Sequence, residues 1–453
     1  MKKLQFFSIL FIFIFVCSHR ASAQDMDFKS ILTQVLQNNP SLQSSRHELD
    51  ALIERYPIAL AGWRPDISAN ASIYHSDIEN SNFTGARGAT TKDFGIDIEQ
   101  PIYKSGRTTA EINEAKNLIY AGFMSAKSLQ QQIILETIQS QINIRRSFEL
   151  LGVEQKNVSL ISDELNAVIA RHKGGELTKT DVDQASTRLA GARSSLLIAE
   201  AEYNNARTEF ERLVGIYVAN PYSFDHDFGT MPSDINAALE QAMSNNPQVL
   251  AAEYAYKSAN NAKDASVRSL FPTLFAFASY NRQFDPQPGI VDESEDKTIG
   301  MRLSVPIYQG GAARAFARQN RYESYARKTD TDRIKRDIKN DFILAWRRYQ
   351  TYAAETNLRQ DQVKSSHLAK KGGSIAAKTG ERSILDVLDA EQEYNLAHRA
   401  MIESYYKYLG AKAEVRMIMG DLTPAFFGVD NPLSDPDNLI VQAGRRILSV
   451  SVD

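Results

Sequence analysis

Cysteine is almost absent from the 453-residue sequence, since its single copy, Cys17, lies within the first 23 residues. Those residues have the pattern of an export signal: two lysines, an apolar run over 4–16 and the small residues Ala21-Ser22-Ala23. We therefore expect residues 1–23 to be a signal peptide and Gln24 to begin the mature chain. An exported chain without disulfides must be held together by burial or by oligomerisation.

A large excess of either charge is also missing. Lys and Arg number 52 against 55 Asp and Glu, a net charge of −3. A nucleic-acid binder would carry a basic footprint, so we expect no nucleic acid among the partners. After the N-terminal run, no segment reaches the ~18 consecutive apolar residues of a transmembrane helix. If the protein lies in a membrane, strands must cross it.

Enzyme motifs are missing as well. The seven histidines are scattered without the spacing of metal ligands, and the sequence contains no phosphate loop, dinucleotide fingerprint or nucleophile elbow. The sequence thus indicates no catalytic residue, no metal and no cofactor.

What the sequence does contain is one plan written twice. Five short segments recur in the same order, 205 to 207 residues later: Leu36–Pro40 and Met243–Pro247, Trp63–Pro65 and Leu270–Pro272, Pro101–Gly106 and Pro306–Gly311, Gly175–Ala185 and Gly380–Ala390, Leu213–Gly215 and Ile418–Gly420. Convergent helix composition would not repeat the prolines and glycines. We expect a first repeat over 24–230, a second over 231–420, and a tail over 421–453 that packs irregularly or is partly disordered.

Alternating apolar and polar residues predict a pair of strands in each repeat, over about 66–103 and 273–308. The half-buried sheet of a soluble protein would show the same alternation. Strands of about ten residues, each pair around a polar loop (76–91 and 285–296), instead suit a membrane wall. In such a wall the charged residues of the strands line a watery lumen: Asp93, Asp97, Glu99 and Arg302.

Four strands cannot close a barrel by themselves. Closed membrane barrels have at least about eight strands, and lipid does not tolerate open sheet edges. The barrel must therefore be shared, with eight strands in a dimer or twelve in a trimer, and a wide aqueous pore favours twelve.

Proline is missing, and glycine nearly so, from 105 to 172 and again from 311 to 372. About 65 residues at ~1.5 Å each make a helix roughly 100 Å long. Apolar residues such as Ile134, Ile138 and Ile142 form only a narrow stripe, which calls for coiled-coil pairing. A second helix returns antiparallel in each repeat, after breaks at Gly175 and Gly380. Helices alone would suit a coiled-coil rod, whereas helices continuous with barrel strands make a conduit.

These features resemble the TolC family of outer-membrane efflux proteins. The resemblance is carried by the strand boundaries Gln100–Tyr103 and Val305–Tyr308, and most specifically by Gly380–Ala390, which is similar to the family's periplasmic tip. It implies an α+β membrane protein and a homotrimer. A β-barrel shared between protomers, with four strands per chain and twelve in the trimer, would lie in the outer-membrane lipid, and a long antiparallel α-helical coiled-coil tunnel would cross the periplasm.

The same resemblance implies a passive exit duct for drugs, other small molecules or proteins, in a tripartite efflux pump or a type I secretion system. The implied partners are a periplasmic membrane-fusion adaptor and an inner-membrane efflux pump of the RND or ABC type. The sequence does not distinguish the two kinds of cargo, because the pump selects it.

The tip segment suggests a periplasmic gate. Asp386 and Asp389 share a helix face, so three copies around an axis would form two carboxylate rings that attract cations. Arg382, one turn earlier, can reach Thr180 or Asp181 beside the neighbouring helix break and hold the tip closed. Aspartate in a first helical turn is also favoured by capping and by the helix dipole, so a purely structural role stays open.

The main rival from another class is a periplasmic coiled-coil adaptor that bridges the two membranes. Such a protein would lack lipid-facing strands, and it would carry a soluble β-rich module in place of two isolated strand pairs.

Overall fold

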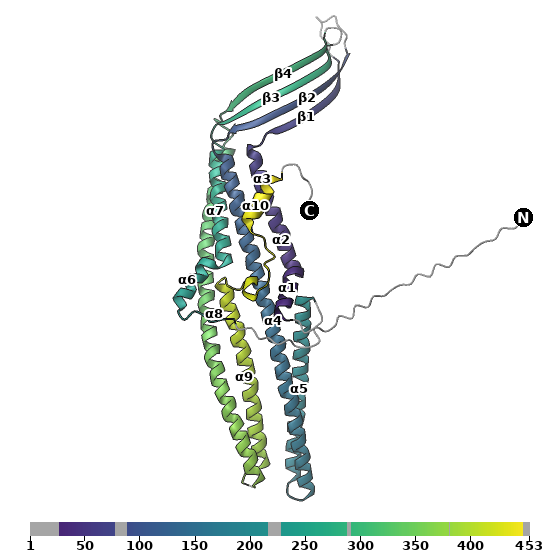
Figure 1. The fold of residues 1–453 in the computed structure, drawn as a ribbon, viewed down its shortest axis with the longest axis vertical. Coiled ribbons are helices and arrows are strands. Elements are labelled where there is room, and N and C mark those ends of the chain that lie inside the picture. Colours follow the sequence, from purple (N-terminus) through teal and green to yellow (C-terminus); the bar gives the residue numbers. More distant parts are fainter. Residues whose placement is uncertain (1–26, 78–87, 216–227, 288–290, 380, 447–453) are drawn as a thin grey trace, which may run out of the picture.

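The computed structural model describes residues 27–77, 88–215, 228–287, 291–379 and 381–446. The expected signal peptide (1–23) and Gly380 lie outside these ranges, as do most of the loop expected over 76–91 and the end of the tail. The chain is elongated, with one sheet at one end and a bundle of helices running away from it (Figure 1). No described helix has an apolar stretch long enough to cross a membrane.

Helices and strands follow the same order in the two halves of the chain. The first half contains α1 (Phe28–Asn38), α2 (Pro40–Ile53), α3 (Arg55–Leu60), the 3-10 turn η1 (Ala61–Trp63), β1 (Asp66–Asp77), β2 (Gly88–Tyr103), α4 (Arg107–Lys173) and α5 (Lys179–Val214). The second half contains α6 (Ile235–Asn245), α7 (Pro247–Arg268), β3 (Thr273–Gln287), β4 (Val291–Ser304), α8 (Ala312–Lys378) and α9 (Ile384–Ile418). Two further elements, η2 (Pro424–Phe427) and α10 (Pro436–Arg445), complete the described chain.

The two longest helices, α4 and α8, have 67 residues each and are roughly 100 Å long at ~1.5 Å per residue. Gly106 and Gly311 precede them with φ of 74° and 84°, the left-handed conformation that glycine adopts without strain. α5 and α9 return antiparallel, so that α4/α5 and α8/α9 form two hairpins whose tips lie opposite the sheet (Figure 1). The predicted long helices and their antiparallel partners are confirmed.

The repeated Asn-Asn-Pro segments begin helices that continue other helices. Asn39 caps α2 and Asn246 caps α7, each accepting hydrogen bonds from two backbone N–H groups, with proline as the first helical residue. Asn246 is buried, and its Nδ2 also donates to the carbonyl oxygen of Ile418 at 2.9 Å. One side chain thus joins the end of α9 to the start of α7.

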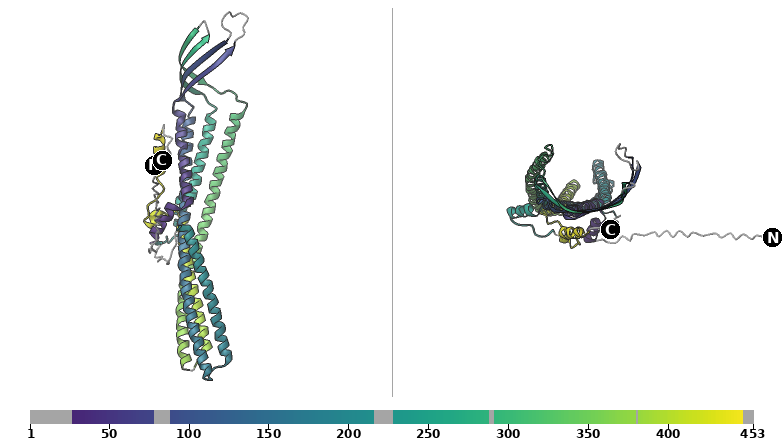
Figure 2. Two further views of the ribbon diagram at one scale, coloured as in Figure 1. Left: turned by 90° about the vertical axis from the view of Figure 1, so that its right-hand side faces the viewer. Right: turned by 90° about the horizontal axis from the view of Figure 1, so that it is seen from above.

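The four strands form one curved antiparallel sheet in the order β1-β2-β3-β4 (Figure 2). The register places Ile67, Ile98, Ala278 and Ile299 in one row across the sheet. Because the residues of such a row share a face, the apolar stripes of all four strands lie on the same side. The predicted alternation therefore holds across the whole sheet and not merely within each strand.

The strands are longer than the predicted ten residues, at 12 to 16. Much of the segment 285–296, expected to be loop, is strand. Two of its glutamates are paired with basic residues just outside the segment, Glu293 with Arg282 across the two strands and Glu295 with Lys297 at 2.6 Å. Polar composition was misread as loop here because the pairing of the charges is visible only in the folded sheet.

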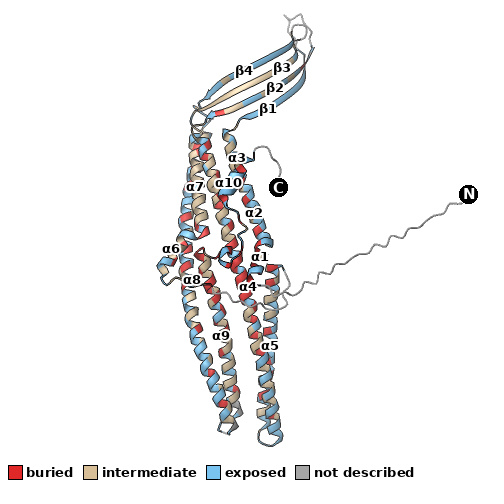
Figure 3. Ribbon diagram, in the orientation of Figure 1, coloured by how far each residue is buried: buried red, intermediate tan, exposed pale blue. Residues whose placement is uncertain are grey.

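The largest apolar core lies about halfway along the helices (Figure 3). Ile134, Ile138 and Ile142 of α4 are buried there against α1, the end of α5 and α9. The stripe predicted for α4 is therefore buried, and the core ties both hairpins together well above their tips.

The described part of the tail, residues 421–446, contains a docked helix that the sequence did not predict. α10 docks on α2, α3 and α4, where Ile440 and Ala443 are buried with residues of α2 and α4. Asp435 caps α10 and Pro436 occupies its first turn. The prolines that mark a break in the sequence therefore begin a helix, because the first turn needs no N–H donor.

Candidate functional site: the polar sheet face and the helix tips

The charged residues expected to line a lumen share one face of the sheet. The register puts Asp93, Asp97 and Glu99 of β2 on the side opposite the apolar stripe, together with Arg302 of β4. Arg302 Nη2 lies 3.1 Å from Glu99 Oε2. The face is not wholly polar, because Phe277 lies between these strands and the Arg302 guanidinium stands 5.3 Å from its ring centre.

β1 and β4 are the two edge strands of this sheet. Each pairs with one neighbour, and no described strand pairs with its outer side. Large apolar side chains are exposed along both edge strands: Ile67 and Ile73 on β1, Ile299 and Met301 on β4. Unpaired backbone groups beside an apolar face are a template for pairing with another chain. One chain thus presents part of a wall with two edges that further copies can extend.

At the tips, two of the predicted gate residues are members of capping boxes. Asp181 accepts hydrogen bonds from the N and Oγ1 of Thr178 at 2.8 and 2.7 Å, at the start of α5. Asp386 accepts from the N of Ser383 at 3.0 Å, and Ser383 Oγ accepts from the N of Asp386 at 3.2 Å. These hydrogen bonds, the side-chain ones first, hold the pKa of both carboxyls below the ordinary value. Both aspartates therefore have the structural role that the sequence left open.

Asp389 has a different partner. Arg188 Nη2 of α5 lies 2.6 Å from its Oδ1, so this ion pair reaches from one hairpin to the other. Asp389 is 66% exposed and Arg188 27%. Sequence reasoning missed Arg188, although a signal existed: it stands seven residues after Asp181 and so lies on nearly the same face of α5.

Arg382 lies beside Asp181 without bonding to it. Both side chains line a cavity of about 400 Å³ between the two tips, which Ser383 and Leu388 also border. Within the described chain, no hydrogen bond or ion pair joins Arg382 to Asp181 or Thr180. Gly175, at φ 81°, makes the tip turn between α4 and α5.

Two further polar contacts join the hairpins above the tips. Arg399 of α9 pairs with Glu154 of α4 at 3.0 Å, although Glu154 is only 2% exposed. The Tyr406 hydroxyl donates to Glu149 Oε1 at 2.8 Å, and burial together with this bond raises the pKa of Tyr406. A cavity of about 350 Å³ separates the Arg399 pair from the Arg188 pair. The seam between the hairpins thus becomes more exposed toward the tips.

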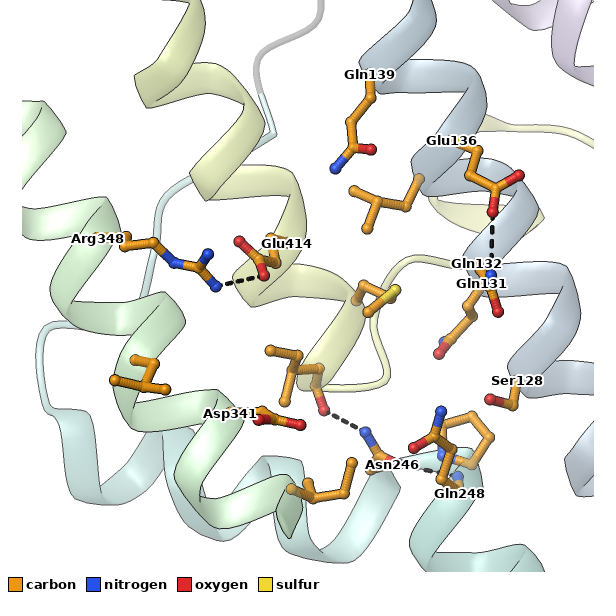
Figure 4. Close-up of a pocket in the computed structure, with 16 residues that line it drawn as sticks. Ser128, Gln131, Gln132, Glu136, Gln139, Asn246, Gln248, Asp341, Arg348 and Glu414 are labelled. Carbon is orange, nitrogen blue, oxygen red and sulfur yellow. Dashed lines mark hydrogen bonds and ion pairs between the residues drawn. The ribbon is translucent and has the colours of Figure 1, made fainter. Parts of the chain in front are cut away.

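A third cavity, of about 370 Å³, lies where α9 ends and α7 begins (Figure 4). Its lining consists mainly of amide, carboxylate and apolar side chains, and Arg348 pairs with Glu414 across it at 2.6 Å. Among the described residues, no group of three or more His, Cys, Asp or Glu side chains is placed to hold a metal ion.

The family model of the outer membrane efflux proteins matches two segments of the sequence, residues 31–216 and 238–421. The chain belongs to this family. The resemblance to TolC is thereby confirmed, and with it an export channel located in the outer membrane whose helices extend into the periplasm.

Similar proteins span nearly the same length. The outer membrane efflux protein BepC of Brucella suis is 24% identical over 401 residues, 88% of this chain and 86% of BepC. TolC of Escherichia coli is 22% identical over 439 residues, 91% and 86% of the two chains. The solved CmeC outer membrane channel of Campylobacter jejuni matches with a TM-score of 0.75 at 14% identity, covering 92% of this chain and 88% of that one. This last likeness shows the common fold.

Proposed function

We propose that three copies of this chain form the exit duct of a tripartite export system, with a closed twelve-stranded barrel above a helical tunnel. The observation that carries the proposal is a four-stranded sheet with two open edges that runs directly into helices roughly 100 Å long. Pairing β4 of one copy with β1 of the next would close every edge, which lipid requires. Twelve strands leave room for an aqueous pore, whereas eight are largely filled by side chains.

The mass of the particle tests this assembly. Purified in detergent, the protein is expected to have about three times the mass of one chain by light scattering, and to run as a heat-sensitive trimer on a denaturing gel. A particle of one or two chains would contradict the proposal, because its sheet edges would stay open or its barrel would be too narrow.

In this assembly the apolar face of the sheet would contact lipid and the polar face would line the lumen. The lumen wall would then carry Asp93, Asp97, Glu99 and Arg302, with Arg302 and Glu99 neutralising one another. The two halves of each chain would act as structural repeats over 24–230 and 231–420, so that three chains supply six similar units to the wall.

The helix tips would form the periplasmic entrance. Three copies would bring Asp386 and Asp389 of each chain toward the axis, with Arg382, Thr180 and Asp181 beside them. Gly175 would form the turn of the first tip; Gly380, expected at the second, lies outside the described residues. Like charges around one axis attract multivalent cations, while the Arg188 pair neutralises part of that charge at rest.

Block of the current by a trivalent cation tests the entrance. In planar bilayers, lanthanum is expected to block the channel, and Asp386→Ala combined with Asp389→Ala is expected to abolish the block. Unchanged block in the double variant would show that the carboxylates lie away from the ion path.

The partners would be a periplasmic membrane-fusion adaptor and an inner-membrane pump of the RND or ABC type, and the cargo either drugs and small molecules or secreted proteins. Family membership favours this channel over the adaptor considered as the rival. Drug susceptibility and secreted-protein levels of a deletion strain would separate the two cargoes. Unchanged values for both would contradict the export function.

A further inference from the structure

The two longest helices differ in what covers them. α4 and α8 begin at Arg107 and Ala312 and both have 67 residues, so each α4 residue has a counterpart 205 positions later. In its upper half, α4 is covered by α2, α3 and α10: Ile119 is buried with Leu49 and Ile440. The hydroxyl of Tyr120 donates a hydrogen bond to Asp437, at the acidic start of α10.

The counterpart face of α8 has no such cover. Among the described elements, its upper half packs mainly against α7 and α6, and at its lower end against the last turns of α9. Tyr325, the counterpart of Tyr120, is 58% exposed, and its hydroxyl has no partner within the described chain. Lys328 stands where α4 has Phe123.

This face of α8 is strongly basic. Residues 312–348 contain eleven Lys and Arg against five Asp and Glu, whereas the matching stretch of α4, 107–143, contains three of each. Eight of these cations are exposed and form no ion pair with any described residue. Five of them share one side of the helix and, together with Tyr325, make up the α8 basic face: Arg314, Arg318, Arg321, Lys328 and Lys339.

The α8 basic face lies on the outside of the wall. Arg314, Arg321 and Lys328 precede Phe342 in the sequence by 28, 21 and 14 residues, all multiples of seven. Lys339 precedes Trp346 by seven residues. Phe342 and Trp346 belong to a buried cluster that also contains Ala238 and Ala242 of α6, and α6 lies on the convex side of the molecule, as α10 does (Figure 2). Residues at such steps share a helix face, so the cations are directed away from the concave side.

We propose that the α8 basic face binds an acidic polypeptide segment of a periplasmic partner, in the way that α10 and its Asp437 cover the same face of α4. The face extends over 25 residues, roughly 37 Å along the helix. A lipid headgroup layer is only about 5–8 Å deep, so a membrane would leave most of these cations unused. An extended or helical peptide with carboxylates can match the whole length. The proposal requires the periplasmic location of α8, and it requires that the next copy in the proposed assembly leaves this face uncovered.

The binding of a fluorescein-labelled 16-residue oligoglutamate to the purified full-length protein tests this, measured by fluorescence anisotropy. Arg318→Glu with Arg321→Glu is expected to raise the Kd at least about tenfold at ~0.1 M salt, since two attractive contacts become repulsive. Binding is also expected to weaken with added salt. The matched control is Lys364→Glu with Lys371→Glu, two exposed cations lower on the same helix, which should leave the Kd within about twofold.

A milder variant guards against misfolding. Tyr325→Phe removes only the hydroxyl that is equivalent to that of Tyr120. A Kd raised about threefold is expected, the loss of one hydrogen bond at a solvent-exposed position. The circular dichroism spectrum and the oligomeric state of every variant should match those of the parent protein.

Binding of the same variants to vesicles of an anionic phospholipid tests the alternative partner, a membrane surface. If the upper double variant lowers vesicle binding but not peptide binding, the partner is a membrane and the proposal is wrong. Equal peptide binding by the upper and lower double variants, or no binding by the parent protein, would show that these cations only keep the surface solvated, which also overturns it.

Discussion

The two hairpins are joined by apolar contacts at the middle of the molecule and by ion pairs near its tips. In the middle, Ile138 of α4 and Ile402 of α9 belong to one buried apolar core. Toward the tips, ion pairs reach across the seam, first to a carboxylate that is 2% exposed and then to one that is 66% exposed. Buried apolar area contributes strongly to stability, whereas an exposed ion pair contributes little. The comparison indicates a permanent joint in the middle and tips that can separate.

The largest expected effect is in the middle. Ile138→Ala removes a fully buried side chain and should lower the free energy of unfolding by about 2–5 kcal/mol, seen as a lower midpoint of thermal unfolding. Leu197→Ala, at an exposed position of α5, is the control and should change it by less than about 0.5 kcal/mol. Equal shifts would mean that the apolar core does not hold the hairpins together.

The next effect is at the deeper ion pair. Glu154→Gln keeps the shape but removes the charge opposite the Arg399 guanidinium. We expect a loss of about 1–1.5 kcal/mol in the free energy of unfolding, because Glu154 is 2% exposed but Arg399 is 37% exposed. Hydrogen exchange of the α9 amides around Arg399 should become faster. Lys364→Gln breaks a fully solvated pair within α8 and should leave these amides unchanged. If both variants exchange at the parental rate, the seam is held by other contacts.

A smaller effect is expected at the tip. Arg188→Gln removes a pair that contributes at most about 1 kcal/mol, because Asp389 is largely exposed. The open fraction of the channel in planar bilayers should rise by up to about fivefold. Arg212→Gln is the matched control, since its pair with Glu209 stays within α5. The charge swap Arg188→Asp with Asp389→Arg should restore the parental open fraction, and failure to do so would assign Arg188 another role.

The smallest effect concerns pH. The caps hold the pKa of Asp181 and Asp386 below the ordinary value. Their stabilisation is therefore fully present above the unfolded pKa of about 4 and is lost as the pH falls through the lowered folded pKa. The first turns of α5 and α9 should be equally protected from hydrogen exchange at pH 8 and pH 5, and should fray below pH 4. Asp386→Asn should remove this dependence from α9 only, and fraying that begins near neutral pH would contradict the assignment.

Sequence patterns predicted those parts of the fold that local periodicity determines. The long helices follow from the absence of proline and from a narrow apolar stripe, and the shared apolar face of the sheet follows from strict alternation. The strands were predicted too short, because Glu293 and its acidic neighbours look like loop residues until Glu293 pairs with Arg282 of the neighbouring strand. The helix α10 was missed because its proline was taken as a break.

The candidate site was less predictable than the fold. Asp389 was expected to be a free ring carboxylate, yet the structure gives it Arg188 as a partner from another hairpin. Such a contact depends on how two separate coiled coils are placed side by side. Spacing within α5 could place Arg188 on the face of Asp181, but it could not pair Arg188 with Asp389. The capping roles of Asp181 and Asp386, by contrast, depend only on Thr178 and Ser383 three residues earlier, so local reasoning reached them as an alternative.

α10 comes after the second half in the sequence but covers helices of the first half only. This determines how many equivalent surfaces the assembly has. The proposed ring of three chains contains six similar units, but three of them are covered on the outside by a tail helix and three are bare. The outer surface of the ring therefore has threefold and not sixfold symmetry. A ligand that recognises one kind of unit should saturate at three molecules per particle, whichever kind it recognises. A ring of six partner subunits around this channel would contact two different surfaces in alternation.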